Sequence, residues 1–267
     1  MKPCLADLEA LGRGAGEILR VGLGRQHQVD YKGVIDLVTE MDHQAEAFLL
    51  EGIHQRFPSH RIITEESGEL HGSQGHTWYI DPLDGTVNYA HGLPIYTISI
   101  AYASAGEIQL GVVYDPSRDE CFSAEKGKGA RLNGHAIQVS GTPDLNQSLL
   151  VTGFPYDIRT NPENNLDNYA NFCLRTQAVR RLGSAAMDLC YIACGRFDGY
   201  WEIRLKSWDV AAGGLIAAEA GAVVTNRFGG HDYLSPPQSI VASNAFIHPQ
   251  MLEVLRLSLP NNAVKDR

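Results

Sequence analysis

The residues of this sequence best suited to chemistry are two carboxylates three positions apart, followed at once by a Gly-Thr pair. Asp81 and Asp84 come after the apolar residues 78–80 and lead into Gly85 and Thr86. Carboxylates gathered in one place repel one another, and they are costly to desolvate unless cations neutralise them. Oxygen ligands without Cys or His favour Mg²⁺ over zinc. This segment therefore indicates a magnesium site.

Further carboxylates occupy the ends of other expected elements. Glu65 and Glu66 end an apolar strand, and Asp209 begins a helix. Because these positions are element termini, their side chains can converge with Asp81 and Asp84 on one point. Taken singly, each has an ordinary structural interpretation, as a solvated strand end, a helix N-cap or a turn at the Asp-Gly pair. The combination favours a functional cluster.

The Gly-Thr corner suits a phosphate ligand beside this cluster. Gly85 allows close approach of the backbone, and N–H groups at a helix start attract phosphate oxygens. Pro94 limits any helix that begins at Thr86 to a short one. Two metal ions beside a phosphate-binding corner are the components of two-metal phosphoryl hydrolysis.

Motifs of other enzyme classes are missing from the sequence. It contains no dinucleotide fingerprint, no phosphate-binding G-x-x-x-x-G-K-[ST] loop, no H-E-x-x-H and no G-x-S-x-G. The haloacid dehalogenase class also uses an Asp-Gly-Thr corner. It is rejected because Pro82 stands where its nucleophilic Asp would be.

Composition and charge limit the expected partners and the expected cellular location of the protein. The 267 residues are 44% hydrophobic, and 22 Lys+Arg against 31 Asp+Glu give a net charge of −9. An anionic protein repels phosphate backbones, so we expect no nucleic-acid partner. We also expect no membrane partner, because no run approaches the roughly 18 to 20 apolar residues of a membrane span. The start lacks a secretory signal and the five cysteines are scattered, so the expected location is the cytoplasm.

The apolar pattern divides the chain into helices and strands that would form layers. Helices are predicted over residues 5–19, 39–57, 164–176, 184–194, 210–220 and 249–257. Strands are predicted over residues 61–64, 77–80, 96–103, 108–114, 120–124, 149–152, 178–181, 222–225 and 239–242. The strands from 61 to 124 are expected to form an antiparallel meander. The layers indicate an α/β or α+β sandwich.

A polar stretch with Gly and Pro around residues 140–146 marks a predicted boundary. Residues 1–140 would form an N-terminal α+β half with most metal ligands and the phosphate-binding corner. Residues 141–267 would form a C-terminal α/β half with Glu202 and Asp209. The two halves are expected to pack as a single compact unit.

Together these segments resemble the inositol monophosphatase family, within the Mg²⁺-dependent, lithium-sensitive phosphatases. Residues 78–88 resemble its first signature and residues 208–221 (WDVAAGGLIAAEAG) its second. Supporting matches, in the family's order along the chain, are Lys32 and residues 36–42, 63–68, 182–186 and 200–202. The resemblance spans essentially the whole chain. It implies an α+β fold, the layered α-β-α-β-α sandwich of the inositol monophosphatase and fructose-1,6-bisphosphatase type.

The resemblance also implies a set of metal ligands. Glu65, Asp81 and the backbone carbonyl of Leu83 would hold one Mg²⁺. Asp81, Asp84 and Asp209 would hold a second, with Asp81 bridging the two. A weaker third Mg²⁺ is implied at Glu65, and Li⁺ is the expected inhibitor.

By the same resemblance, further residues would act on the phosphate and the attacking water. Thr86, hydrogen-bonded to Asp42, would orient the water and help to deprotonate it. The N–H groups of Gly85 and Thr86 would bind phosphate oxygens, and Lys32 would lie near the water network of the metals. No covalent phospho-enzyme is expected. Taken alone, Asp42 would be only the capping partner of Thr39.

The leaving group would be held by positions that the family uses to bind ring hydroxyls, here Asp84, Ser184, Ala185 and Glu202. A carboxylate can accept from two adjacent hydroxyls, so Glu202 suits a polyol. The expected reaction is hydrolysis of myo-inositol monophosphate to inositol and phosphate. Fructose-1,6-bisphosphate, 3′-phosphoadenosine 5′-phosphate and histidinol phosphate remain alternative substrates.

Two further interpretations stay open. A regulatory or scaffold protein built on the same fold is an alternative of another class, although all four acidic ligand positions are intact. Arg204 and Lys206 lie close in sequence to Glu202 and Asp209. They could therefore bind a second anionic group or be solvated cations. A homodimer is expected from the family resemblance.

Overall fold

The structure, a computed structural model, describes residues 2–25, 29–31 and 37–257. The helices in this part of the chain are α1 (Leu5–Gly22), α2 (Glu40–Arg56), α3 (Thr86–Ala90), α4 (Leu166–Cys173), α5 (Ala185–Ala193), α6 (Ser207–Glu219) and α7 (His248–Leu255), with a 3-10 turn η1 (Leu145–Gln147). The strands are β1 (Val29–Tyr31), β2 (Leu37–Thr39), β3 (His60–Thr64), β4 (Gly68–Leu70), β5 (Ser73–Asp84), β6 (Thr97–Ser104), β7 (Glu107–Asp115), β8 (Glu120–Glu125), β9 (Ala130–Leu132), β10 (His135–Ala136), β11 (Leu149–Thr152), β12 (Ala178–Arg180), β13 (Gly199–Leu205), β14 (Val223–Thr225) and β15 (Gln238–Ser243).

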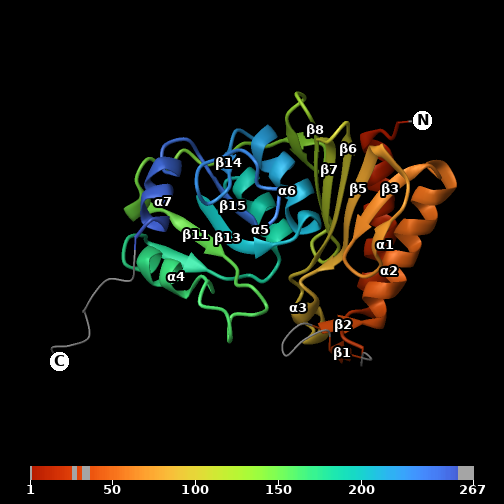
Figure 1. Ribbon diagram of the computed structural model, residues 1–267, viewed down its shortest axis with the longest axis horizontal. Coiled ribbons are helices and arrows are strands. Elements are labelled where there is room, and N and C mark those ends of the chain that lie inside the picture. The colour runs from red at the N-terminus through yellow and green to blue at the C-terminus, as the bar shows by residue number, and fades with distance from the viewer. Residues whose placement is uncertain (1, 26–28, 32–36, 258–267) are drawn as a thin grey trace.

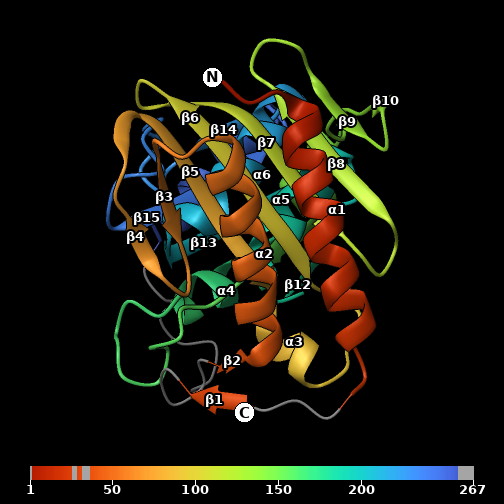
Figure 2. The same ribbon diagram turned by 90° about the vertical axis from the view of Figure 1, so that its right-hand side faces the viewer.

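The elements form five layers, in the order helix, sheet, helix, sheet, helix (Figure 1). An eight-stranded sheet has the order β10-β9-β8-β7-β6-β5-β3-β4, and a five-stranded sheet has the order β12-β11-β13-β15-β14. Helices α1 and α2 cover the outer face of the larger sheet (Figure 2). Helices α5 and α6 lie between the sheets, and α4 and α7 cover the far side of the smaller one. The predicted layered α+β sandwich is confirmed. The antiparallel meander is confirmed for β5-β6-β7-β8, but its extension to β3 is wrong. Strand β4 reverses the chain between β3 and β5, so these two strands pair in parallel.

The strand that carries the paired carboxylates is longer than predicted. A strand is predicted over residues 77–80, whereas β5 continues through Asp81 to Asp84. Between these two aspartates the pairing of β5 with β6 shifts by one residue. Such a bulge re-aims side chains, and it accommodates Pro82, which has no N–H for the ladder. The carboxylates thus lie on an irregular strand end rather than in a loop after it.

Helix α6 is packed closely enough on β7 to fix the position of Asp209. Residues 210–217 are buried, as expected of a helix that lies between two sheets. A Cβ atom at Gly111 of β7 would lie 2.9 Å from the carbonyl oxygen of Ala212. Only glycine allows that approach, so the start of α6 is set by backbone contact.

Helix α2 begins with the capping box expected from its sequence. The Thr39 N–H donates to Asp42 Oδ2 over 2.8 Å, and the Thr39 Oγ1 accepts from the Met41 N–H over 3.2 Å. The box satisfies backbone N–H groups that have no partner within the helix. It also fixes the Asp42 carboxylate, which is fully buried.

The two sheets are contributed by successive parts of the chain. The strands of the larger sheet end at Ala136, and those of the smaller sheet begin at Leu149. The division at residue 140 stays a prediction. Across the described ranges, none of the helices combines the length and apolarity that a membrane crossing requires.

Candidate active site

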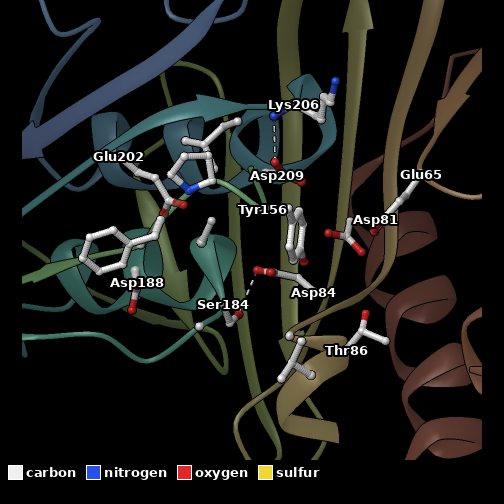
Figure 3. A pocket seen from close by; sticks show the side chains of 18 of the residues that line it. Glu65, Asp81, Asp84, Thr86, Tyr156, Ser184, Asp188, Glu202, Lys206 and Asp209 are labelled. Atoms are coloured by element: carbon white, nitrogen blue, oxygen red, sulfur yellow. Dashed lines mark hydrogen bonds between the residues drawn. The ribbon is translucent and has the colours of Figure 1, made fainter. Parts of the chain in front are cut away.

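A cavity of about 250 Å³ lies where β5, α3, α5, β13 and α6 meet (Figure 3). Its lining includes the predicted site residues Glu65, Asp81, Leu83, Asp84, Gly85, Thr86, Ser184, Ala185, Glu202 and Asp209. Asp42 is buried next to this lining. Lys32 falls outside the described residues, so its predicted role stays a prediction. The structure thus brings together side chains that are far apart in the sequence.

Asp81 is the most deeply buried carboxylate of the acidic side of the cavity, with 2% of its surface exposed. Burial, and then the charges of Glu65 and Asp84, raise the pKa of Asp81 well above its ordinary value. Its Oδ1 accepts from the Leu83 N–H over 3.0 Å. Asp209 is capped in a similar way by the Lys206 N–H at 2.7 Å. Burial and the charge of Glu65 raise its pKa as well.

Glu65 follows β3 in a turn that a buried carboxylate of α2 holds in place. Glu46, only 4% exposed, accepts from the hydroxyls of Thr64 and Ser67 over 2.6 and 2.7 Å. It also accepts from the backbone N–H groups of Glu66 and Ser67. Glu46 could not be predicted from the sequence, because its role depends on contacts with residues about 20 positions away.

Asp84 connects the two halves of the site. Its Oδ2 accepts from the Ser184 hydroxyl over 2.8 Å and from the Ala186 N–H over 2.7 Å. Figure 3 shows its carboxylate directed toward Ser184 at the start of α5. Burial raises the pKa of Asp84 to about 6, although these hydrogen bonds oppose the rise. One carboxylate therefore ties β5 to α5 across the cavity.

Thr86 lies against Asp42 beneath the cavity. Its Oγ1 is 3.0 Å from Asp42 Oδ1 and 2.9 Å from the Leu83 carbonyl oxygen. The hydroxyl has one hydrogen, so it can donate to one of these acceptors at a time. Its lone pairs remain able to accept a hydrogen bond. The neighbouring Gly85 has φ +102°, and a Cβ there would lie 2.8 Å from the Ile95 carbonyl oxygen.

Glu202 lies on the opposite side of the cavity from Glu65 (Figure 3). It is 8% exposed, and its Oε2 accepts from the Tyr200 hydroxyl over 2.7 Å. Burial raises the pKa of Glu202 to about 7, and the hydrogen bond from Tyr200 limits the rise. Ser184 caps α5, where its hydroxyl accepts from the Met187 N–H. This side of the cavity offers oxygen acceptors away from the acidic cluster.

Comparison with known proteins decides the family. The profile of the inositol monophosphatase family matches residues 1–259. The chain belongs to the inositol monophosphatase family. It is 40% identical to the Nus factor SuhB of Pseudomonas aeruginosa over 97% of this chain and 98% of the relative. It is 41% identical to the Nus factor SuhB of Escherichia coli K12 over 96% and 97%. The structure of inositol monophosphatase from Anabaena (Nostoc) sp. PCC 7120 is 42% identical, with a TM-score of 0.87 over 96% of both chains.

The donor set of this inositol monophosphatase family member fits Mg²⁺. Glu65, Asp81, Asp84 and Asp209 present only oxygen atoms, which hard divalent cations prefer. Within the described ranges, no three Asp, Glu, His or Cys side chains lie close enough to hold an ion as they stand. Bound cations would reverse the repulsion between these carboxylates and lower the raised pKa values.

The Glu202 carboxylate leads to a prediction for the metal-free protein. Its pKa of about 7 means that the folded state binds this proton more tightly than the unfolded chain, in which the pKa is about 4. Stability should therefore fall as the pH rises from about 4 to about 7. Glu202→Gln should remove this loss, stabilising the protein by roughly 3 kcal/mol at pH 8. Urea unfolding between pH 5 and 8 measures the effect, and an identical pH dependence in both proteins would contradict it.

Other residues of the lining were not predicted from the sequence. Asp188 and Arg181 both border the cavity, as does the segment 153–156. Arg204 and Lys206, by contrast, were expected near the site from the sequence, and both border the cavity and are exposed. Arg204 Nη2 lies 2.7 Å from Asp157 Oδ2, and the backbone of Arg204 has φ +61°.

Proposed function

We propose that this chain is a Mg²⁺-dependent phosphatase for the phosphate monoester of a small polyol, with myo-inositol monophosphate as the first candidate. One observation carries the proposal. A single cavity has Glu65 and Asp81 on one side and Glu202 on the other. The first pair suits cations beside a phosphate, and Glu202 suits the hydroxyls of a leaving group. Membership of the inositol monophosphatase family supports the same chemistry.

When bound, Mg²⁺ would offset the carboxylate charge, acidify water and stabilise charge on the phosphoryl group. The side chains Glu65, Asp81, Asp84 and Asp209, with the Leu83 carbonyl, would hold it. Thr86 would accept a hydrogen bond from the attacking water and align it, because its own hydrogen is directed to Asp42 or to the Leu83 carbonyl.

The same cavity would orient the ester. The N–H groups of Gly85 and Thr86 would bind phosphate oxygens at the start of α3. Ser184, Ala185 and Glu202 would accept or donate hydrogen bonds to the hydroxyls of the leaving group. Asp84, anchored to Ser184, would keep the metal side and the leaving-group side at a fixed separation, and such fixed geometry lowers the barrier.

A substrate panel tests the proposal. Phosphate release would be measured with myo-inositol 1-phosphate, fructose-1,6-bisphosphate, 3′-phosphoadenosine 5′-phosphate and histidinol phosphate. We expect kcat/KM to be highest for the inositol ester. A higher kcat/KM for another ester would make that ester the preferred substrate. If folded, Mg²⁺-loaded protein hydrolysed none of the esters, the proposal that the chain is a phosphatase would be overturned. Inhibition by Li⁺, a homodimer and a cytoplasmic location belong to the same proposal.

The relatives named Nus factor SuhB support a second candidate, a Nus-factor role that needs no hydrolysis. The phosphatase-deficient variant Asp81→Asn would separate the two roles. If this variant restores growth of a host strain lacking the protein, the non-hydrolytic role is the required one. If only the wild type restores growth, hydrolysis is required.

Arg204 leads to a prediction about bisphosphates. A second anionic group could draw Arg204 away from Asp157, its partner at 2.7 Å. Arg204→Ala should then lower kcat/KM for fructose-1,6-bisphosphate by about 10-fold or more, the range of a charge-assisted hydrogen bond. The value for inositol monophosphate should not change. Asp157→Ala is the matched control, because it removes the ion-pair partner of Arg204 and should raise kcat/KM for fructose-1,6-bisphosphate. Equal effects of Arg204→Ala on both esters would contradict the prediction.

A further inference from the structure

Asp188 is a buried carboxylate of the cavity that the proposed function does not use. It lies in α5, one turn after Ser184, and only 1% of its surface is exposed. It borders the cavity together with Glu202, and Figure 3 shows both on the side away from Asp81 and Glu65. Its Oδ1 has no hydrogen-bond partner among the residues that the structure describes.

A buried carboxylate with an unpartnered oxygen destabilises the folded protein. An unpartnered buried polar group destabilises the folded state, and the cost is larger if the group is charged. Burial, and then the charges of Glu202 and Asp84, raise the pKa of Asp188 well above its ordinary value, while Arg181 opposes the rise. No hydrogen bond from the described residues compensates Oδ1, so a structural role does not account for this oxygen of Asp188.

A second buried aspartate shows what a structural role looks like in the same chain. Asp115 is also 1% exposed. Its Oδ1 accepts from the backbone N–H groups of Ser117 and Arg118, and its Oδ2 accepts from the Arg118 guanidinium over 2.9 Å. Asp115 lies outside the cavity lining. The two aspartates share burial and differ in partners, which points to a ligand as the missing partner of Asp188.

The chemistry around Asp188 selects the class of that ligand. Glu202 borders the same cavity, its charge acts on Asp188, and its Oε2 is engaged by the Tyr200 hydroxyl. Two neighbouring acceptors match two neighbouring hydroxyl donors of one molecule. A second phosphate is disfavoured by like charge. Arg181 borders the same cavity and offsets part of the negative charge, so a cationic ligand is not required.

We propose that Asp188 is a specificity-determining residue that accepts a hydrogen bond from a leaving-group hydroxyl next to the one bound by Glu202. This role rests on the proposed phosphatase function. It restricts the preferred substrates to esters of polyols with adjacent hydroxyls. A leaving group without hydroxyls would leave Oδ1 unpartnered in the complex and gain nothing from Asp188.

The kinetic test compares two substrates that differ in hydroxyls. Myo-inositol 1-phosphate presents adjacent hydroxyls, and p-nitrophenyl phosphate presents none. Asp188→Ala should lower kcat/KM for the inositol ester roughly 10- to 100-fold, the value of one hydrogen bond to a charged group. The value for p-nitrophenyl phosphate should stay within about 2-fold. Equal losses on both substrates, or no loss on either, would overturn the role of Asp188. If the wild type hydrolyses neither ester, the proposed function itself fails, and this role fails with it.

A stability measurement separates binding from a structural role and needs no activity. Asp188→Asn removes a buried carboxyl group whose ionisation is disfavoured in the folded state, so the Tm of the metal-free protein at pH 7.5 should rise by about 2–4 °C. Asp115→Asn, the matched control, loses compensated hydrogen bonds, and its Tm should fall. It should also leave the ratio of the two kcat/KM values unchanged. A fall in Tm for Asp188→Asn comparable to that of Asp115→Asn would show a structural role and overturn the proposal.

Discussion

Asp81→Asn is expected to lower Mg²⁺-dependent phosphate release by at least about 10³-fold, because it removes the carboxylate that would bridge two cations. The same change should raise the Tm of the metal-free protein. Asp81 is 2% exposed, and its pKa is raised by burial and by the charges of Glu65 and Asp84. A neutral amide of the same shape avoids both costs. Opposite effects on activity and stability are typical of a residue kept for function.

Initial rates at saturating Mg²⁺ and thermal unfolding in chelator measure the two effects of Asp81→Asn. Asp115→Asn is the control, because Asp115 is equally buried but is compensated by Ser117 and Arg118. It should lose stability and retain kcat. Near-full activity of Asp81→Asn would contradict the bridging role. A lower Tm of its metal-free form would contradict the electrostatic account of the cavity.

Thr86→Val is expected to lower kcat by about 10²- to 10⁴-fold, the usual contribution of a positioned proton acceptor. The Mg²⁺ concentration for half-maximal activity should change little, because the Thr86 side chain is not among the implied metal ligands. Thr86→Ser keeps the hydroxyl near Asp42 and should retain most of the activity. The kcat of Asp42→Asn should lie between those of Thr86→Val and Thr86→Ser, since the change weakens the hydrogen-bond acceptor that lies 3.0 Å from the Thr86 Oγ1.

Steady-state kinetics across a Mg²⁺ titration distinguish these variants. A large rise in the Mg²⁺ requirement of Thr86→Val would place Thr86 in metal binding instead of water alignment. If Thr86→Val were as active as the wild type, Thr86 would have no role in the mechanism. Circular dichroism should be unchanged in Thr86→Ser, which serves as the folding control.

Features of this fold that depend on local sequence could be predicted. The capping box of Thr39 and Asp42 uses residues three apart, and the structure contains it. The hairpins β6-β7 and β7-β8 follow from apolar segments separated by short turns, whereas α3 lies between β5 and β6. The extension of β5 through Asp84 could not be predicted, because Pro82 is ordinarily a strand breaker and the bulge against β6 accommodates it.

Features of the site that depend on distant contacts needed the structure. The sequence resemblance implied Ser184 as a substrate contact, but its hydrogen bond to Asp84, 100 residues away, is a tertiary fact. In the sequence, Asp188 is simply one polar residue in an otherwise apolar helix. Only its burial against the cavity distinguishes it from an ordinary solvated position. Glu46 also needed the structure, because its role is to accept hydrogen bonds from Thr64 and Ser67 in the turn that contains Glu65.

The most direct test of the account is phosphate release by wild-type protein that has been stripped with chelator and then titrated with Mg²⁺, using myo-inositol 1-phosphate. We expect no phosphate release in chelator, recovery as Mg²⁺ is restored, and inhibition when Li⁺ is added at saturating Mg²⁺. We also expect that Tm rises with Mg²⁺, because the ion binds the folded state. Release that is equal with and without Mg²⁺, or no release at any Mg²⁺ concentration by protein shown to be folded, would contradict it.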